Sequence, residues 1–432
     1  MLFNNSFQKI LVGLIVLIQL SSKAQNMNYL DWFSDDVLRL DLVHTGDAEN
    51  EYYFTEQFFQ ESAWAGARTK LLDKTAFGDN YFEVYDSLSQ TLIYSRGFNN
   101  LFYEWQGTAE AKLTNRSFEE VIRCPFPHKT VQIKIYRREK DLDLNLLHQF
   151  YVNPNSYRIN KGAKFTFKSE KISGELPVNK AVDVVIIAEG YTKEEMGTFK
   201  NDAKKLSEFL LDTEPFSLVK EKFNIRIIFS DSEESGTDIP GDSIWKNTIV
   251  NSHFYTFNSE RYLTSQSIKK IYDIASLVPY DQVYVLVNSD KYGGGGIFNY
   301  YNLTSAHHPL SPWVFIHEFG HGFAGLADEY YDGSTAFNDM YDLNSEPWES
   351  NISTLANPES KWKSKLEKGT AIPTPATEEN IDKVGFYEGG GYVEKGIYRA
   401  FQNCEMKALK QGFCPVCQDA ILKMVKFNTD DE

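Results

Sequence analysis

The hydrophobic pattern of this chain changes midway, and the change restricts the folds that the chain can adopt. Up to about residue 157, short segments alternate apolar with polar residues, and turn sequences such as Gly78-Asp79-Asn80 separate them. Alternation of this kind is typical of half-buried strands, and short strands at this spacing favour a sandwich or barrel. The predicted strands are Val37–Val43, Tyr52–Phe59, Tyr81–Tyr85, Gln90–Tyr94, Ser117–Arg123, Val131–Arg137 and Leu146–Val152. We therefore expect an accessory all-β sandwich domain over residues 26–157.

The second half of the chain alternates strand-like with helix-like segments. It follows a polar stretch with scattered Pro and Gly, which predicts a linker over residues 158–180. Val182–Ala188 is continuously apolar, as in a strand buried on both faces, and Lys193–Asp212 has helical spacing. The next predicted elements are the strands Phe223–Phe229 and Gln282–Val287 and the helix Ser267–Leu277. Residues 181–432 are therefore expected to form an α/β domain.

Residues 1–25 have the features of a cleaved secretory signal peptide. Lys9 precedes an apolar run from Ile10 to Leu20, and the run is followed by the small-x-small sequence Ser22-x-Ala24. The run is shorter than the roughly 20 residues that span a bilayer, and no later segment is apolar enough to do so. We expect a protein without a membrane-spanning segment, exported to the periplasm, the cell surface or the medium.

The charge of the chain excludes one class of partner. The formal net charge is −16 at pH 7. Nucleic acids and anionic membranes attract clustered Lys and Arg, so nucleic acid is not an expected partner. The sequence does not indicate an oligomeric state.

Four cysteines allow more than one arrangement. Outside the cell, Cys404 could pair with Cys414 or Cys417 and staple a turn near the C-terminus. A metal site made of these three cysteines is the alternative, although the sequence offers no obvious fourth ligand. Cys124 is interpreted as a buried free thiol.

A motif for metal binding lies on a predicted helix that begins at Ser311-Pro312, with Ser as the cap and Pro in the first turn. His317 and His321 are four residues apart, so they project from one side of the helix and can hold one metal ion. Glu318 would lie beside the open coordination position, where it can take a proton from metal-bound water and pass it to the leaving amine. Zinc suits this chemistry because it polarises a scissile carbonyl and acidifies bound water. The HExxH pattern alone is loose, because buried helices can carry it by chance.

The residues after the helix supply candidates for the third ligand that a catalytic zinc requires. Gly325 can end the helix and turn the chain, so that Asp328, Glu329 and Tyr330 come back toward the ion. Acidic side chains at a helix C-terminus oppose the helix dipole, which favours ligation over a solvated helix end. Asp328 is the first choice for the third ligand, with Glu329 as the alternative.

The glycine run Gly293–Gly296 opens a segment that ends at Ser305. This segment is interpreted as a sheet edge beside the site helix, which would bind an extended peptide through backbone hydrogen bonds. A mobile surface hairpin is the alternative interpretation.

Several spaced motifs of the second half occur together in one known family. They are HEFGHGFAGLADEY (His317–Tyr330), Glu346-Pro347-Trp348, Lys361-Trp362-Lys363, Phe386–Ala400 and CEMKALKQGFCPVC (Cys404–Cys417). With these motifs the chain resembles the secreted metallopeptidases of gut bacteria that are named for a member cleaving immunoglobulin A. The resemblance covers most of the second half, and the β-rich first half is consistent with the accessory domain of that family.

The resemblance implies a metzincin-like zinc peptidase domain. His317 and His321 would be zinc ligands, Glu318 the general base and Met406 the residue of a supporting Met-turn. Tyr392 or Tyr398 could donate a hydrogen bond to the oxyanion, as tyrosines do in related enzymes.

The chain departs from the metzincin pattern after the second histidine. Metzincins have Gly three residues and the third ligand six residues after it, whereas Ala324 holds the first place here and Asp328 follows His321 by seven. The choice between Asp328 and Glu329 therefore stays open. Substrate choice resides in loops and accessory domains, so specificity for immunoglobulin is not implied.

The leading functional hypothesis is a secreted zinc endopeptidase that acts on extracellular or mucosal proteins, with a protein or glycoprotein as substrate. The alternative is a catalytically silent surface protein that binds glycans or protein, although silent relatives should lose Glu318. A zinc amidase that acts on sugars or cell wall is a third hypothesis, which the resemblance to Met-turn enzymes disfavours.

Overall fold

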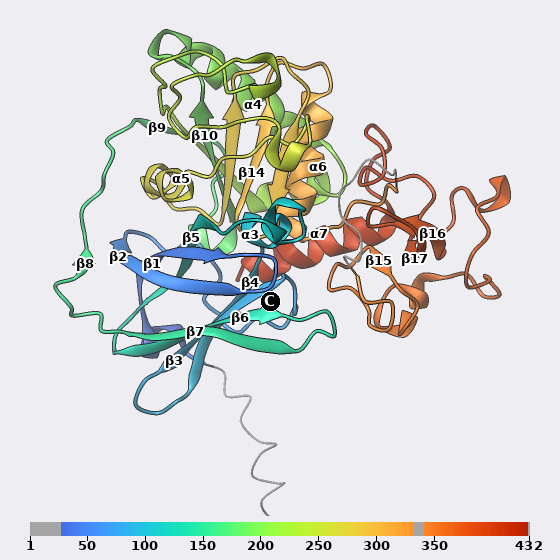
Figure 1. Cartoon of the computed structure of the whole chain (residues 1–432), viewed down its shortest axis with the longest axis horizontal. Helices are drawn as coiled ribbons and strands as arrows, with labels where there is room; N and C mark the ends of the chain where they lie inside the picture. Colours follow the sequence, from blue (N-terminus) through green and yellow to red (C-terminus); the bar gives the residue numbers. More distant parts are fainter. Residues whose placement is uncertain (1–26, 332–340, 431–432) are drawn as a thin grey trace, which may run out of the picture.

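The computed structural model describes residues 27–331 and 341–430 of the chain. The predicted signal peptide, residues 1–25, lies outside the described residues. Figure 1 shows the N-terminal sheets in blue and teal next to an α/β region in green to orange, with the C-terminal segments in red. The β-rich first region and the later α/β region expected from the sequence are both present.

The N-terminal region contains two four-stranded sheets, with the strand orders β5-β1-β2-β8 and β4-β3-β6-β7. Inward side chains of both sheets, among them Leu40, Val84 and Ile133, form one apolar core. This sharing explains why each strand alternates apolar with polar residues. The strands are β1 (Phe33–Gly46), β2 (Glu51–Glu61), β3 (Asn80–Asp86), β4 (Leu92–Phe98), β5 (Arg116–Pro127), β6 (Val131–Arg138), β7 (Leu144–Val152) and β8 (Ile159–Asn160). The short helices α2 (Tyr29–Trp32) and α3 (Leu101–Gln106) complete the region.

The α/β region is organised around a six-stranded sheet of order β13-β14-β12-β10-β11-β9. The four inner strands pair in parallel, and the two edge strands, β9 and β13, are antiparallel to their neighbours. Every residue of β10 is buried, as its continuous apolar run predicted. The strands are β9 (Ser169–Ser173), β10 (Val182–Glu189), β11 (Phe223–Ile228), β12 (Gln282–Val287), β13 (Gly294–Ile297) and β14 (Tyr301–Ser305).

Helices cover both faces of this sheet. On one face, α4 (Met196–Asp212), α6 (Ser311–Ala324) and α7 (Pro415–Asn428) share a core with alternate residues of β10. On the other face, α5 (Ile268–Ala275) packs against the remaining residues of β10 and against side chains of α3. A small sheet of order β15-β17-β16 lies beyond α6, made of β15 (Ile352–Ser353), β16 (Tyr387–Gly390) and β17 (Val393–Arg399).

The connection between the two regions is more structured than the linker predicted over residues 158–180. It contributes β8 to the edge of an N-terminal sheet and β9 to the edge of the six-stranded sheet. Both additions are edge strands, which need no continuous apolar pattern because one side remains unpaired. Polar composition therefore concealed them.

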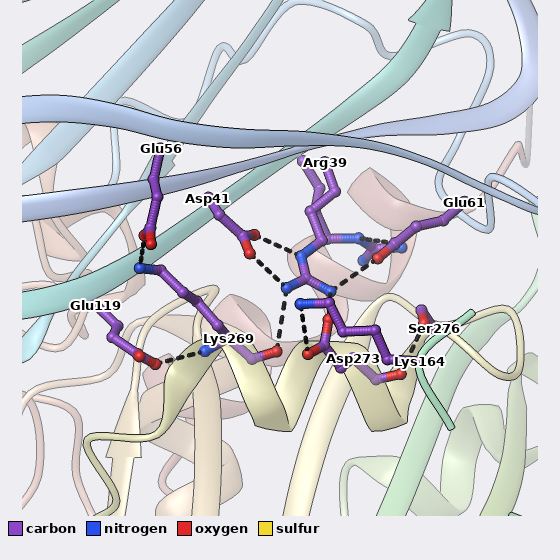
Figure 2. A network of polar contacts seen from close by, with 10 residues as sticks. Arg39, Asp41, Glu56, Glu61, Glu119, Lys164, Lys269, Asp273 and Ser276 are labelled. Atoms are coloured by element: carbon purple, nitrogen blue, oxygen red, sulfur yellow. Dashed lines mark hydrogen bonds and ion pairs between the residues drawn. The ribbon is translucent and has the colours of Figure 1, made fainter. Parts of the chain in front are cut away.

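A buried ionic network joins the two regions, as Figure 2 shows. Arg39 of β1 is only 1% exposed, and its guanidinium lies 2.8 Å from Asp273 of α5 and 3.2 Å from Glu61 of β2. Lys164 of the connection lies 3.1 Å from the same Asp273 carboxylate. A buried charge that loses its partner is costly, so the network fixes how β1 and α5 dock.

Among the described residues, no helix combines the length and the apolar character needed to cross a membrane.

Candidate active site

Helix α6 carries the predicted metal-binding motif along one wall of a cavity. The helix begins at Ser311, so the predicted cap is wrong by one residue: Leu310 holds the cap position. The Ser311 hydroxyl instead donates to the carbonyl oxygen of Ser305, which ties the helix start to the end of β14. Gly325 follows the helix with a left-handed φ of 61°, the conformation that ends helices and favours glycine. The chain turns there, as predicted, and brings Asp328 back beside the helix.

Three ligand-type atoms converge on the cavity side of α6. The Nε2 atoms of His317 and His321 lie 3.1 Å apart. Asp328 Oδ1 lies 3.1 Å from the first and 3.3 Å from the second. These three side chains are spaced closely enough to share one metal ion.

Hydrogen bonds on the far side of each ring set the tautomer of both histidines. His317 Nδ1 lies 3.0 Å from the carbonyl oxygen of Glu405, and His321 Nδ1 lies 2.6 Å from that of Leu326. Because a carbonyl oxygen can only accept, each Nδ1 donates its proton and each Nε2 is left with a lone pair. Apart from the two Nε2 atoms that face it, the buried Asp328 Oδ1 has no hydrogen-bond donor in the described part of the chain. Three lone pairs that face one another fit a cation between them.

The electrostatics agree with a site for positive charge. Burial disfavours charge on the imidazole of His321, but the Asp328 carboxylate outweighs it and raises the pKa of His321 to about 9. Burial also acts to raise the pKa of Asp328, yet the two imidazoles hold that pKa well below its usual range. The carboxylate therefore stays ionised and attracts either protons or a metal ion to the two Nε2 atoms.

Glu318 lies between this cluster and the glycine-rich strand β13. A Cβ on Gly294 would lie 2.6 Å from Glu318 Oε1, and one on Gly296 would lie 2.3 Å from the Glu318 carbonyl oxygen. Only glycine therefore lets the strand pass so close to α6. No described residue donates a hydrogen bond to the Glu318 carboxylate, and burial raises its pKa. Glu318 is thus free to bind water and suited to take a proton from it.

Strand β13 is the sheet edge beside α6 that the sequence suggested, but its outer side is partly covered. Gly294 forms a bridge with Tyr262, and the Leu263 amide donates to the Gly294 carbonyl oxygen at 3.1 Å. A peptide substrate could extend the sheet only beyond this position.

The cavity measures about 580 Å³ and is lined by both halves of the chain. The N-terminal region contributes Asp79 and Asn100 together with Tyr103 and Glu104 of α3. Burial raises the pKa of Glu104 to about 7, and its carboxylate accepts a hydrogen bond from the Tyr262 hydroxyl at 2.6 Å. Sequence reasoning missed this contribution, because scattered polar residues in a β-rich region carry no local signal for a shared cavity.

Aromatic residues close the cavity on the side of Asp328. The Tyr392 hydroxyl donates to Asp328 Oδ2, and the rings of Tyr392 and Tyr330 lie 5.2 Å apart. Arg261, which was not predicted, donates to the Tyr330 hydroxyl at 3.0 Å. Tyr398 does not line the cavity: it lies on the central strand β17, paired with Ser353 and Glu388. The suggestion that Tyr398 reaches the site is therefore wrong.

Met406 and Glu329 lie behind the cluster. The Met406 sulfur is so close to α6 that a Cβ on Gly320 would approach it to 3.0 Å. The Met406 carbonyl oxygen accepts the Glu329 amide at 2.8 Å, so the turn supports the segment that carries Asp328. The Glu329 side chain, the alternative third ligand, points away from the histidines and groups with three cysteines.

Two family models match the chain. The family model described as IgA Peptidase M64 matches residues 171–383, which include α6 and Asp328, and the model described as Peptidase M64 N-terminus matches residues 28–149. No curated protein matched the chain. The two matches follow one another in the order of the two regions. The chain therefore belongs to the IgA peptidase M64 family, and this membership indicates a peptidase.

Proposed function

We propose that the protein is a secreted, metzincin-like zinc endopeptidase that cleaves extracellular or mucosal proteins, including glycoproteins. One observation carries the proposal: His317, His321 and Asp328 converge beside an unpartnered Glu318 carboxylate at a 580 Å³ cavity. The secretory signal predicted over residues 1–25 is the basis for export.

The ligand set favours zinc over other metals. Two imidazoles and one carboxylate with an open position match catalytic zinc sites, and fixed Nδ1 hydrogen bonds are the usual support for such ligands. When bound, zinc would polarise a scissile carbonyl and make water more acidic.

The residues around the cluster have separate duties in peptide hydrolysis. Glu318 takes a proton from the attacking water and passes it to the leaving amine, for which its raised pKa is an advantage. Arg261 and Tyr330 place donors at the cavity wall, where they can orient the substrate carbonyl. Tyr392 holds Asp328 in position.

The test is cleavage of a mixture of secreted proteins that includes immunoglobulin A. Mature protein is compared with Glu318→Ala and with the control variant Glu379→Gln. Glu379 is an exposed acidic residue that does not line the cavity. New peptide termini are read by mass spectrometry. We expect new termini from the unchanged protein and from Glu379→Gln, and turnover lower by roughly three orders of magnitude in Glu318→Ala. Absence of new termini from protein that holds its zinc would favour the glycan- or protein-binding alternative.

A further inference from the structure

Behind the candidate active site lies a second cluster of ligand-type side chains, made of Glu329, Cys404, Cys414 and Cys417. One ligand atom from each lies within 4.8 Å of all the others. Three of the four residues are fully buried, and Cys414 is 3% exposed. Glu329 supplies the fourth ligand that could not be identified near the three cysteines in the sequence.

The spacing of the sulfur atoms matches a metal site. Cys404 Sγ and Cys417 Sγ lie 3.6 Å apart, close to the ~3.8 Å expected between two thiolates on one tetrahedral zinc with Zn–S bonds of about 2.3 Å. Cys417 Sγ lies 3.3 Å from Glu329 Oε1. The second oxygen, Glu329 Oε2, is buried with no hydrogen-bond donor among the described residues. A buried carboxylate oxygen without a donor is costly unless something positive faces it.

The start of helix α7 favours deprotonated sulfur at Cys414. Cys414 caps the N-terminus of α7, a helix of 14 residues with Pro415 in its first turn. The positive end of the helix dipole stabilises a thiolate at this position. The Cys414 amide also donates toward Cys404 Sγ at 3.4 Å.

We propose that Glu329, Cys404, Cys414 and Cys417 form a closed structural zinc site, separate from the histidine cluster. A disulfide would use only two of the three sulfurs and would leave Glu329 Oε2 without a partner, while Oε1 keeps the hydrogen bond from Asn351, whereas a zinc ion engages all four groups. The site joins the stretch after α6 to the Met406 turn and to the start of α7, which lie far along the chain from it. Binding releases the thiol protons to solvent as each sulfur is coordinated.

The first test is the optical spectrum of the full mature protein after replacement of zinc by Co²⁺. Thiolate ligation gives a sulfur-to-cobalt charge-transfer band that histidine and carboxylate ligands cannot produce. We expect this band in the unchanged protein, and metal analysis should give about two metal ions per chain, the sum of one open and one closed site. This measurement needs no variant, so misfolding of a cysteine variant cannot obscure it.

Variants then assign the band. Cys417→Ser should remove the band and one metal ion per chain, while Asp328→Ala should remove one metal ion but keep the band. Cys124→Ala is the matched control, because Cys124 is also fully buried but lies in the N-terminal core, and it should change neither quantity. Absence of the band would overturn the proposal. Thiol titration in denaturant would then show whether the three cysteines are free thiols or whether two of them form a disulfide. Because no readout involves catalysis, the result is independent of the proposed peptidase activity.

Discussion

Two clusters of ligand-type side chains share one stretch of chain but differ in their surroundings. The histidine cluster opens to the cavity, and the side chains of His317 and His321 are 13% and 16% exposed. The cysteine cluster has no such opening, since Cys404, Cys417 and Glu329 are fully buried. A catalytic metal needs a free coordination position that solvent and substrate can reach, whereas a structural metal is closed by its protein ligands. The segment that carries Asp328 and Glu329 therefore lies between a site suited to catalysis and a site suited to stabilising the fold.

Asp328 and Glu329 show how the chain achieves this separation. The two acids are neighbours in the chain, yet Asp328 groups with the two histidines and Glu329 with the three cysteines. Backbone hydrogen bonds hold the segment in that register: the Glu329 amide donates to Met406 at 2.8 Å, and the Gly391 amide donates to Asp328 at 2.8 Å. Two acids that look equivalent in the sequence are distinguished only by contacts made with distant residues.

The largest effect is expected when each acid is removed in turn. Asp328→Ala should abolish measurable peptidase activity, because the histidine pair alone cannot retain zinc, while the sulfur-to-cobalt band persists. Glu329→Ala should weaken the cysteine site and lower thermal stability, while the histidine site still binds metal. Metal content, activity and the cobalt spectrum of both variants check this. If Glu329→Ala loses the metal of the histidine site and Asp328→Ala keeps it, the assignment of the two acids is reversed.

A smaller loss is expected when the strand beside the open site is pushed away. In Gly294→Ala the new methyl group would lie 2.6 Å from Glu318 Oε1 and 2.7 Å from Val314, so the carboxylate must shift. A displacement of about 1 Å at a catalytic group can cost on the order of 100-fold in rate, so kcat should fall by about that factor while both metals stay bound. Gly197→Ala is the control, because a Cβ there meets no atom within 4 Å. Equal kcat values for the two variants would mean that the position of Glu318 against β13 is unimportant.

The sequence predicted the strands and the histidine pair, because these features depend on the spacing of residues that are close together in the chain. The seven N-terminal strands and the buried run of β10 follow from alternation and apolar continuity, and the structure contains them. The histidine pair follows from helical spacing, because residues four apart share a face whatever the rest of the chain does. Asp328 became a candidate because Gly325 turns the chain, and Asp328 Oδ1 lies 3.1 Å from His317 Nε2.

The remaining parts of the site depend on long-range packing. Glu104 reaches the cavity because the N-terminal region docks onto the α/β region, and no motif around Glu104 reports that docking. The role of Glu329 beside the cysteines requires the Met406 turn to meet the segment after α6, which sequence spacing does not reveal. Tyr398 was suggested by the resemblance alone. Its strand, β17, pairs with β15 and β16, and this pairing places Tyr398 away from the cavity.

Tyr392→Phe should weaken the histidine site alone. The substitution keeps the ring that packs on Tyr330 and removes only the hydroxyl that donates to Asp328. Losing a supporting hydrogen bond to a metal ligand typically costs about 10-fold or more in affinity, so zinc should transfer more readily to a competing chelator. Tyr398→Phe, which lies outside the cavity, should leave the transfer unchanged. A matching loss of metal from the cysteine site in Tyr392→Phe would show that the two clusters are not separable.

The smallest effect concerns the acid that the N-terminal region adds to the open site. Burial, with a contribution from Asp79, raises the pKa of Glu104 to about 7, so the fold favours the protonated carboxyl. A pKa that is higher in the folded state means that this stabilisation is complete below the ordinary pKa of glutamate. It is lost as the pH rises from the ordinary pKa of glutamate to about 7, which we expect to lower the free energy of unfolding by roughly 3 kcal/mol. Glu104→Gln, a neutral mimic of the protonated acid, should remove this loss, so urea unfolding of the two proteins should agree at pH 4 and diverge by pH 8. If the free energies of unfolding of the two proteins instead changed equally between pH 4 and pH 8, Glu104 would be solvated like a surface acid. The N-terminal wall of the cavity would then be more accessible to solvent than the structure indicates.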